Sequence, residues 1–183
     1  MNAWNEIKIT TTRLLLRHLR PGDAADLLGY RCVPEVYKYQ TWRPVKLQDA
    51  VQFIQSTASS PGIIDSWYQL AICHRNDMKI IGDIGIHFLP PDAREIELGC
   101  TVKPEHQGLG YATEAMSSVI DYLFNNQAAS RVICCLDPRN ERSRQLMDKL
   151  GLKLHVKKLN LKISAFPDDL VFSIRANQWK PAA

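Results

Sequence analysis

The chain has 183 residues, of which 45% are apolar and 23% charged, and its net charge is +4. These ordinary values exclude disorder, collagen and coiled coil as descriptions of the whole chain. The length favours a single domain over residues 1–183, large enough to fold without disulfides or metal. No run reaches the about 20 consecutive apolar residues of a membrane-spanning helix, so we expect no membrane partner.

The N-terminal sequence and the cysteines indicate the compartment. The first twenty residues contain no apolar core of signal-peptide length, so we expect no secretory leader. The five cysteines are odd in number and form no CxxC pair, which suggests neither a disulfide framework nor a zinc site. We therefore expect a cytoplasmic protein without a bound metal.

The first half of the chain predicts two helices followed by a meander of strands. The segment RLLLR at 13–17 predicts a strand, and Asp23 is expected to cap a helix that begins at Ala24. A second helix is expected over 48–57, after a loop at 41–44. Turn-forming residues then separate three expected strands, at 67–73, 79–88 and 95–102.

The second half alternates helices with strands. Apolar residues recur at helical spacing over 110–126, and a further helix is expected to end at Gly151. Strands are expected at 131–136, 152–156 and 170–175. The order β-α-α-β-β-β-α-β-α-β-β predicts an α/β (α+β) fold. In it, a mixed central sheet of about seven strands is covered on both faces by about four helices.

The loop before the helix at 110–126 is a candidate anion site. Gly108, Gly110 and Ala112 keep the backbone bare where the helix begins, so free amides and the helix dipole favour a pyrophosphate there. The alternative is a turn whose glycines only relieve backbone strain. The Walker pattern is absent and the GxGxxG fingerprint is incomplete.

Positive charge is concentrated between residues 131 and 162, which hold nine Lys or Arg and three Asp or Glu. Such a segment attracts phosphates, unless it is only a solvated helix face and strand edge. No aromatic residue interleaves these charges, which argues against a nucleic-acid platform. We therefore expect no nucleic-acid partner.

The same loop resembles a known motif. Gln107-x-x-Gly110-x-Ala112 after Val102-x-Pro104 resembles the acetyl-CoA-binding motif of the GNAT N-acetyltransferases, and PEHQGLGYATEA is similar to their RimJ/RimL-type branch. Three further segments agree in order, at 12–17, 140–152 and 170–179. The resemblance implies the GNAT fold, whose sheet splits in a V between the fourth and fifth strands, here 95–102 and 131–136.

The resemblance implies acetyl-CoA as co-substrate, with its pyrophosphate on loop amides and its pantetheine against Val102 and Asn140. Asn140 suits an N-cap equally well. Arg139, Arg142 and Arg144 are candidates for the nucleotide end. The implied cofactor contacts are Val102, Gln107, Gly108, Leu109, Gly110, Tyr111, Ala112, Thr113, Asn140 and Ser143.

The implied reaction is direct attack of a primary amine on the thioester. Glu97 is the candidate base, through a water molecule; the alternatives are an ion pair with Arg94 or Arg131, or an exposed carboxylate. Many GNAT enzymes have an acidic Tyr where this chain has Met147, and a thioether donates no proton. Ser143 is then the nearest hydroxyl, more as a sulfur contact than as a true acid.

The acceptor is expected to be a protein N-terminus, as in RimJ/RimL enzymes, or a small amine. Trp42 is expected to line its groove and Trp67 to lie in the core. A covalent route through Cys100 lacks a placed His-Asp partner. The alternative function is a non-catalytic acyl-CoA-binding module in which Glu97 is idle. We expect a monomer or a homodimer.

Overall fold

The computed structural model describes residues 6–126, 129–155 and 168–180. Its strands are β1 (Ile9–Thr10), β2 (Leu14–His18), β3 (Ser66–His74), β4 (Ile80–Phe88), β5 (Glu95–Val102), β6 (Arg131–Leu136), β7 (Lys153–Leu154) and β8 (Leu170–Arg175). Its helices are α1 (Ala24–Arg31), α2 (Pro34–Tyr37), α3 (Leu47–Ser56), α4 (Tyr111–Asn126) and α5 (Glu141–Lys149). Short 3₁₀ turns lie at Pro21–Asp23, Pro104–His106 and Ala176–Gln178.

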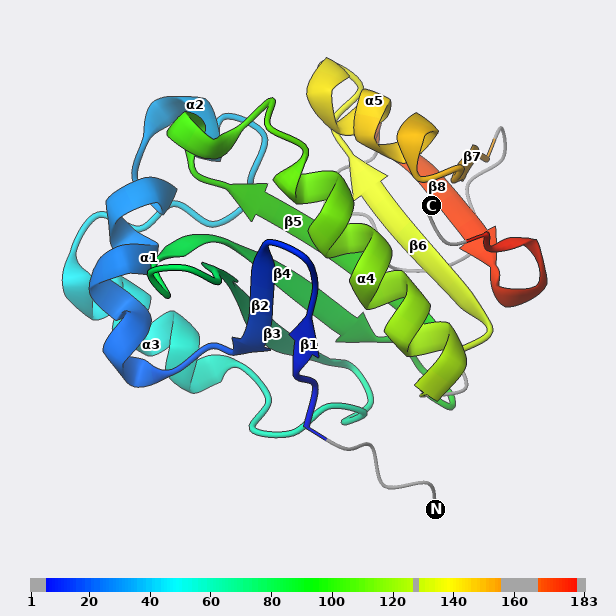
Figure 1. Ribbon diagram of the computed structural model, residues 1–183, viewed down its shortest axis with the longest axis horizontal. Helices are drawn as coiled ribbons and strands as arrows, with labels where there is room; N and C mark the ends of the chain where they lie inside the picture. The colour runs from blue at the N-terminus through cyan, green and yellow to red at the C-terminus, as the bar shows by residue number, and fades with distance from the viewer. Residues whose placement is uncertain (1–5, 127–128, 156–167, 181–183) are drawn as a thin grey trace.

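All eight strands form one mixed sheet in the order β1-β2-β3-β4-β5-β6-β8-β7. Neighbouring strands are antiparallel except for β5 and β6, which are parallel and are connected through α4. Figure 1 shows α4 crossing the near face of this sheet. The sheet is therefore a meander joined to a strand–helix–strand unit, as the element order predicts.

The sheet is buried on both faces. Successive side chains of a strand point to opposite faces, and in the central strands both faces carry apolar residues. One face packs under α4 and α5, with Leu70 of β3 and Ile84 of β4 in the same core cluster as Val119 of α4. The opposite face packs under α1 and α3, where Ala71 of β3 meets Leu27 of α1. Side chains of β4 and β5 that point away from α4 thus lie on the α1 and α3 side.

The sheet splits between β5 and β6. Their parallel register holds only three residue pairs, Glu95–Arg131, Ile96–Val132 and Glu97–Ile133. Beyond Glu97 the two strands part, and Figure 1 shows their arrowheads separated. The V-shaped split is therefore confirmed, and Glu97 lies at its vertex.

Most expected elements are confirmed, and the strands at 95–102, 131–136 and 170–175 have the predicted bounds. Two short elements were not expected: the two-residue β1, which pairs with β2, and α2. The strand expected at 152–156 covers only Lys153–Leu154 among the described residues, and position 156 lies outside them. The fold class itself is as predicted.

Asp23 is the N-cap residue of α1, as expected, but its side chain makes no capping hydrogen bond to this helix. Its carboxylate instead accepts two hydrogen bonds from the guanidinium of Arg17 and one from the backbone amide of Arg20. These bonds hold the pKa of Asp23 below its ordinary value, although burial acts in the opposite direction.

No helix among the described residues is long and apolar enough to cross a membrane. In the same ranges, no cluster of three or more His, Cys, Asp or Glu side chains is arranged to hold a metal ion.

Candidate functional site

The loop between β5 and α4 has the backbone that the sequence predicts for an anion site. Gly108 and Gly110 have φ angles of +77° and +82°, in the left-handed region that favours glycine. A Cβ at Gly108 would meet no atom within 4 Å, so its backbone faces open space. Within the described residues, the backbone amides of 108–113 donate no hydrogen bond. They are free to bind a phosphate at the N-terminus of α4.

Gln107 connects the two sides of the split. Its Nε2 donates to the carbonyl of Val102 at 2.9 Å, and its Oε1 accepts a hydrogen bond from Arg142 of α5. The side chain of Gln107 thus fixes the end of β5 relative to α5. The carbonyl of Val102, a predicted pantetheine partner, already accepts one bond.

The loop is also held by the N-terminal segment, a contact that the sequence analysis did not predict. Arg13 donates from Nη1 to the carbonyl of Leu109 at 3.0 Å and from Nε to Glu114 at 2.6 Å. Its guanidinium carbon lies 4.3 Å from the centre of the Tyr111 ring. The Glu114 carboxylate also accepts from the Thr11 hydroxyl at 2.6 Å. Arg13 therefore contacts the loop and the first turn of α4 together.

Helix α5 carries the predicted contacts on the other side of the split. The side-chain oxygen of Asn140 accepts from the backbone amide of Ser143 at 3.1 Å, so Asn140 is the N-cap of α5. Gly151 has a φ of +74° and follows this helix as predicted. Met147 is 4% exposed and belongs to the core cluster beneath α4. Met147 is therefore a core residue in this structure.

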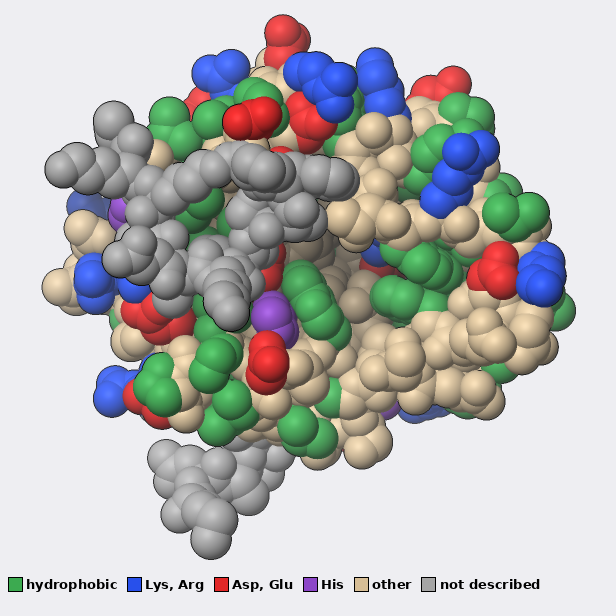
Figure 2. Space-filling view, turned by 180° about the vertical axis from the view of Figure 1, so that it is seen from behind, with side chains coloured by type: hydrophobic (Ala, Val, Ile, Leu, Met, Phe, Trp, Pro, Cys, Tyr) green, Lys and Arg blue, Asp and Glu red, His purple; other side chains and the backbone are tan. Residues whose placement is uncertain are grey.

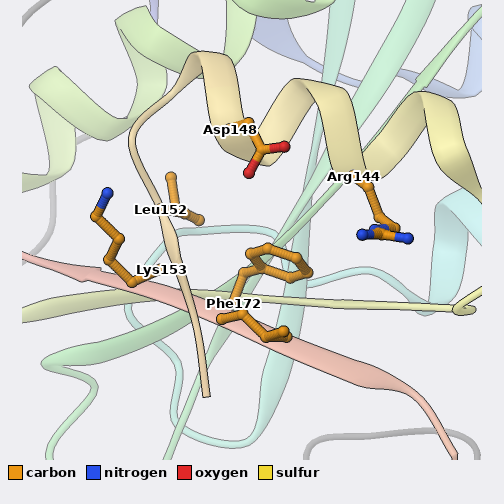
Figure 3. Close-up of a pocket in the computed structure, with 6 residues that line it drawn as sticks. Arg144, Asp148, Leu152, Lys153 and Phe172 are labelled. Atoms are coloured by element: carbon orange, nitrogen blue, oxygen red, sulfur yellow. The ribbon is translucent and has the colours of Figure 1, made fainter. Parts of the chain in front are cut away.

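The three candidate arginines take different positions. Arg142 bonds Gln107 beside the loop. Arg139 is paired with Asp137 at 2.6 Å. Arg144 lines a hollow of about 330 Å³ between α5 and β7, where Figure 3 shows it above Phe172 with Asp148 and Lys153. Apart from Arg144, no predicted site residue lines that hollow. Lys157, Lys158 and Lys162 of the basic segment lie outside the described residues.

Glu97, at the vertex of the split, is engaged by a histidine. Its Oε2 lies 3.1 Å from Nδ1 of His87, which faces it across the β4–β5 register. The alternatives raised for Glu97 are not observed: the residue is 8% exposed, and Arg131 pairs instead with Glu95. Among the described residues, no ion pair joins Arg94 to Glu97. Nε2 of His87 lies 3.4 Å from a carboxylate oxygen of Asp65.

Trp67 lies at this site and not in the core, so that expectation is wrong. Its side chain is 41% exposed and its ring stacks on His87 with the centroids 4.7 Å apart. Figure 2 looks at this face of the molecule, opposite α4, and shows it hollowed near its centre, with histidine and acidic side chains beside the hollow. A buried carboxylate, an imidazole and an exposed aromatic ring thus meet there.

The thiols of Cys100 on β5 and Cys135 on β6 are held protonated. Burial raises the pKa of Cys100 to about 12, with the charge of Asp83 adding to the effect. Burial also raises the pKa of Cys135 to about 12, helped by the charges of Glu97 and Asp169. A neutral thiol is a weak nucleophile, which agrees with the expectation that Cys100 lacks the partners for a covalent route.

A buried ionic cluster lies between α1 and the sheet. The carboxylate of Asp83, 0% exposed, accepts hydrogen bonds from Tyr30 at 2.5 Å, from Arg31 at 3.0 and 2.5 Å, and from Gln69. Burial and the charge of Asp83 raise the pKa of Tyr30 well above its ordinary value. Asp83 pairs in register with Thr101, so this cluster supports the α1 side of β5.

Trp42 borders that cluster from the loop between α2 and α3. Its ring stacks on Phe53 of α3 at 4.2 Å, and the guanidinium of Arg31 lies over it at 5.9 Å. Trp42 is thus half-buried on the α1 and α3 side of the sheet. Its predicted place in the acceptor groove stays a prediction.

The structure brings Glu97, the loop residues 107–113 and the N-terminus of α5 to one split. It adds His87, Asp65 and Arg13, which the sequence analysis did not assign to the site. One signal was available for His87: a hairpin of the predicted strands 79–88 and 95–102 places His87 opposite Glu97. Arg13 and Asp65 approach from distant segments, for which a single sequence gives no register.

Comparisons with known proteins agree with this architecture. The family model described as "Acetyltransferase (GNAT) domain" matches residues 13–153. The "Uncharacterized N-acetyltransferase YoaA" of Bacillus subtilis is 31% identical over 150 residues, 79% of this chain and 82% of that protein. The "[Ribosomal protein uS5]-alanine N-acetyltransferase" of Escherichia coli is 22% identical over 96% of this chain and 94% of its own length.

A solved structure shows the same fold. It is Mycobacterium smegmatis RimJ in complex with CoA-disulfide, with a TM-score of 0.72, 20% identity, and coverage of 90% of this chain and 82% of that one. The family model spans well over half of the chain, including β5, the loop and α5. This chain therefore belongs to the GNAT family and is an acetyltransferase.

Proposed function

We propose that this protein transfers the acetyl group of acetyl-CoA to a primary amine by direct attack. The observation that carries the proposal is the position of Glu97. This buried carboxylate lies at the vertex of the β5–β6 split, and the free amides of 108–113 lie at the open end of β5. An anion site and a proton acceptor therefore lie along one strand, as a phosphate-bearing acyl donor requires.

The chain's own residues fit such a donor. The backbone amides from Gly108 to Thr113 hold the pyrophosphate, and the two glycines adopt the positive φ angles of this loop without a Cβ that would crowd it. Arg142 adds positive charge beside Gln107. Beyond Glu97 no described strand pairs with β5 on the side of β6, and this edge binds the amide-containing arm of the donor. The GNAT relative RimJ binds CoA-disulfide, which supports this assignment.

Acetyl-CoA supplies an acetyl group activated as a thioester. Glu97 takes the proton that the amine loses, either directly or through one water molecule. A backbone amide near the end of β5, between Cys100 and Val102, polarises the acetyl oxygen. Ser143, at the first turn of α5, hydrogen-bonds the sulfur.

The acceptor is a protein N-terminus or a small amine. The relative named as a ribosomal protein uS5-alanine N-acetyltransferase supports the first of these. The two carboxylates beside His87, those of Asp65 and Glu97, favour an acceptor that arrives with positive charge. The five free cysteines agree with a reducing compartment, so the cytoplasm is our proposed location. One domain over 1–183, as a monomer or homodimer, stays a prediction.

The test is turnover of acetyl-CoA with a panel of peptides and small amines, together with calorimetry of CoA binding. We expect CoA binding and release of free CoA that depends on one class of amine. The rival function, a non-catalytic acyl-CoA-binding module, predicts CoA binding without turnover for every acceptor. Absence of CoA binding by the folded protein would contradict both.

A further inference from the structure

Three side chains form a path from the vertex of the split to solvent. Glu97 contacts Nδ1 of His87 at 3.1 Å, and Asp65 lies 3.4 Å from Nε2 of the same ring. The side chains of Glu97 and His87 are 10% and 13% exposed, whereas that of Asp65 is 78% exposed. The imidazole therefore connects a buried carboxylate with one at the surface.

The surrounding backbone holds the imidazole in this position. The Trp67 ring stacks on His87 with an angle of 16° between the planes. The same ring lies so close to Gly85 that a Cβ there would come within 2.9 Å of it. Asp65 has a φ of 58°, which is uncommon for a residue with a side chain, and its amide donates to the Phe88 carbonyl at 2.7 Å. The stacked Trp67 ring thus fixes the plane of the imidazole, and the backbone of Asp65 fixes the carboxylate near its outer nitrogen.

We propose that His87 and Glu97 act as one proton acceptor for the attacking amine, with Asp65 stabilising the proton on the outer nitrogen of His87. The proposal rests on the acetyl transfer proposed above. Glu97 is the catalytic residue that meets the amine, and His87 is a positioning residue that acts through it. Asp65 completes the path to solvent.

The proton is accounted for at each step. Before reaction, neutral His87 donates from Nδ1 to the Glu97 carboxylate. The amine forms its bond to the acetyl carbon, the carbon–sulfur bond breaks, and the sulfur leaves as a thiolate. Glu97 takes the amine proton, and exchange with water leaves the additional proton on Nε2 of His87, beside Asp65. That nitrogen then releases its proton to water, and the thiolate takes one from water.

The electrostatics of the site favour this role. Burial alone lowers the pKa of His87, but the hydrogen bond and charge of Glu97, followed by those of Asp65, outweigh burial and raise it above the ordinary 6.5. From β6, Cys135 faces Glu97 as a neutral thiol, with Asp169 beyond it. An isolated glutamate has a pKa of about 4.3, far below that of an amine. The His87–Glu97 pair binds a proton more tightly than an isolated glutamate would, so it is a better base for removing a proton from the amine.

A first experiment tests the pair without any turnover. The imidazole of His87 is titrated by NMR in the full-length protein, its signal among the five histidines being assigned with His87→Gln. Glu97→Gln and Asp65→Asn should each lower the pKa of His87, Glu97→Gln by more. Asn tolerates the left-handed backbone of residue 65, so this variant keeps the turn. Asp77→Asn, which removes a carboxylate 3.8 Å from His74, should leave His87 unchanged.

A second experiment tests the role in the reaction, by measuring kcat/KM against pH with one amine throughout. The rate falls on the acidic side because the pair must be deprotonated. Asp65→Asn should move this fall to lower pH by the same interval as in the NMR titration. His87→Gln should move it further and lower the plateau rate about tenfold or more. The melting temperature of each variant checks that it is folded.

The outcomes separate this proposal from the function on which it rests. If the pKa of His87 is the same in Glu97→Gln as in the wild type, the proposed pair is overturned, whether or not the enzyme is active. A lower plateau in His87→Gln with no shift of the acidic fall, in it or in Asp65→Asn, overturns the proton role and makes His87 a packing residue. If the wild-type protein acetylates no amine, the proposed function fails and the catalytic role of the pair fails with it.

Discussion

Arg13 and Glu114 are 101 residues apart in sequence, yet the Nε of Arg13 lies 2.6 Å from a carboxylate oxygen of Glu114. Glu114 is in the first turn of α4, and Arg13 also bonds the carbonyl of Leu109. The segment that leads into β2 therefore fixes the start of the helix whose amides face the anion site. Arg13 therefore affects CoA binding indirectly, by holding the loop in the shape that exposes these amides.

This contact predicts a loss of CoA affinity in Arg13→Gln. Glutamine cannot bond Leu109 and Glu114 at once, so the loop should lose its fixed shape. We expect the dissociation constant for CoA to rise about fivefold to tenfold, equivalent to about 1 to 1.4 kcal/mol. Calorimetry measures it. The control is Arg75→Gln, because Arg75 bonds the carbonyls of Thr11 and Thr12 on the same segment without touching the loop.

The left-handed backbone of Gly110 predicts that a side chain there abolishes tight CoA binding. Gly110→Leu should strain the turn and place a side chain where the pyrophosphate approaches, so affinity should fall at least tenfold, or about 1.4 kcal/mol. Gly151→Ala is the matched control: it places a side chain at a φ of +74° at the end of α5, outside the loop. Equal CoA affinity in folded Gly110→Leu and the wild type would remove the anion site from this loop.

The buried position of Glu97 predicts a rate defect without a binding defect. Glu97→Gln should lower kcat by about a hundredfold or more while CoA affinity is kept. The deficit should shrink as pH rises towards the pKa of the amine, because less substrate then needs deprotonation. Steady-state kinetics across pH measure this. Glu95→Gln, on the same strand and paired with Arg131, is the control and should keep kcat.

Met147 and Ser143 predict opposite responses to substitution. Met147→Tyr adds a hydroxyl and volume to a residue of the core, so we expect a lower melting temperature and no gain in kcat. Ser143→Ala should raise the KM for acetyl-CoA more than it lowers kcat. A hundredfold loss of kcat in Ser143→Ala that Met147→Tyr restores would instead make Ser143 the acid.

The Asp83 cluster predicts a large loss of stability. Asp83→Asn leaves the buried guanidinium of Arg31 without its counter-ion, and such losses cost about 3–5 kcal/mol. Urea unfolding of the two proteins measures the difference. The control is Asp77→Asn, which breaks the exposed pair with Lys79 and should leave the free energy of unfolding nearly unchanged. Equal effects of the two substitutions would contradict the importance of burial.

The parts of this protein that were predictable from sequence are those that depend on local pattern. Helical periodicity gave α4, and the glycines at 108 and 110 gave the turn, because each needs only neighbouring residues. Asp23 lies at the N-cap of α1 as expected, but it makes no capping bond because Arg17 and Arg20, upstream of it, engage its carboxylate. Aromatic character alone placed Trp67 in the core, whereas the bare surface of Gly85 holds its ring at the rim.

In the candidate site, too, some residues follow from local sequence and others depend on contacts between distant segments. Glu97 and the loop follow one another along the chain, so a motif can find them. The partners that set their properties, His87, Asp65 and Arg13, come from three other segments and depend on pairing across the sheet. Among the described residues, Glu97 faces a histidine and not the arginine that was considered as an alternative partner, because strand register, and not charge, decides which side chains face each other.

The three-pair seam between β5 and β6 has a consequence for how the protein unfolds. Within the described residues, the strand pairing that joins the five N-terminal strands to β6, β8 and β7 covers only Glu95–Glu97, with two further main-chain bonds from Ser130 and Arg131 to the carbonyl of Arg94. A ligand that bonds both edges of the gap lengthens this seam, and at a hundredfold excess over its dissociation constant adds about 2.7 kcal/mol of stability. Without it, we expect the C-terminal strands to open as a separate unit, exchanging their amide hydrogens before the meander does. We therefore expect the bound donor to slow the exchange of the C-terminal strands more than that of the meander.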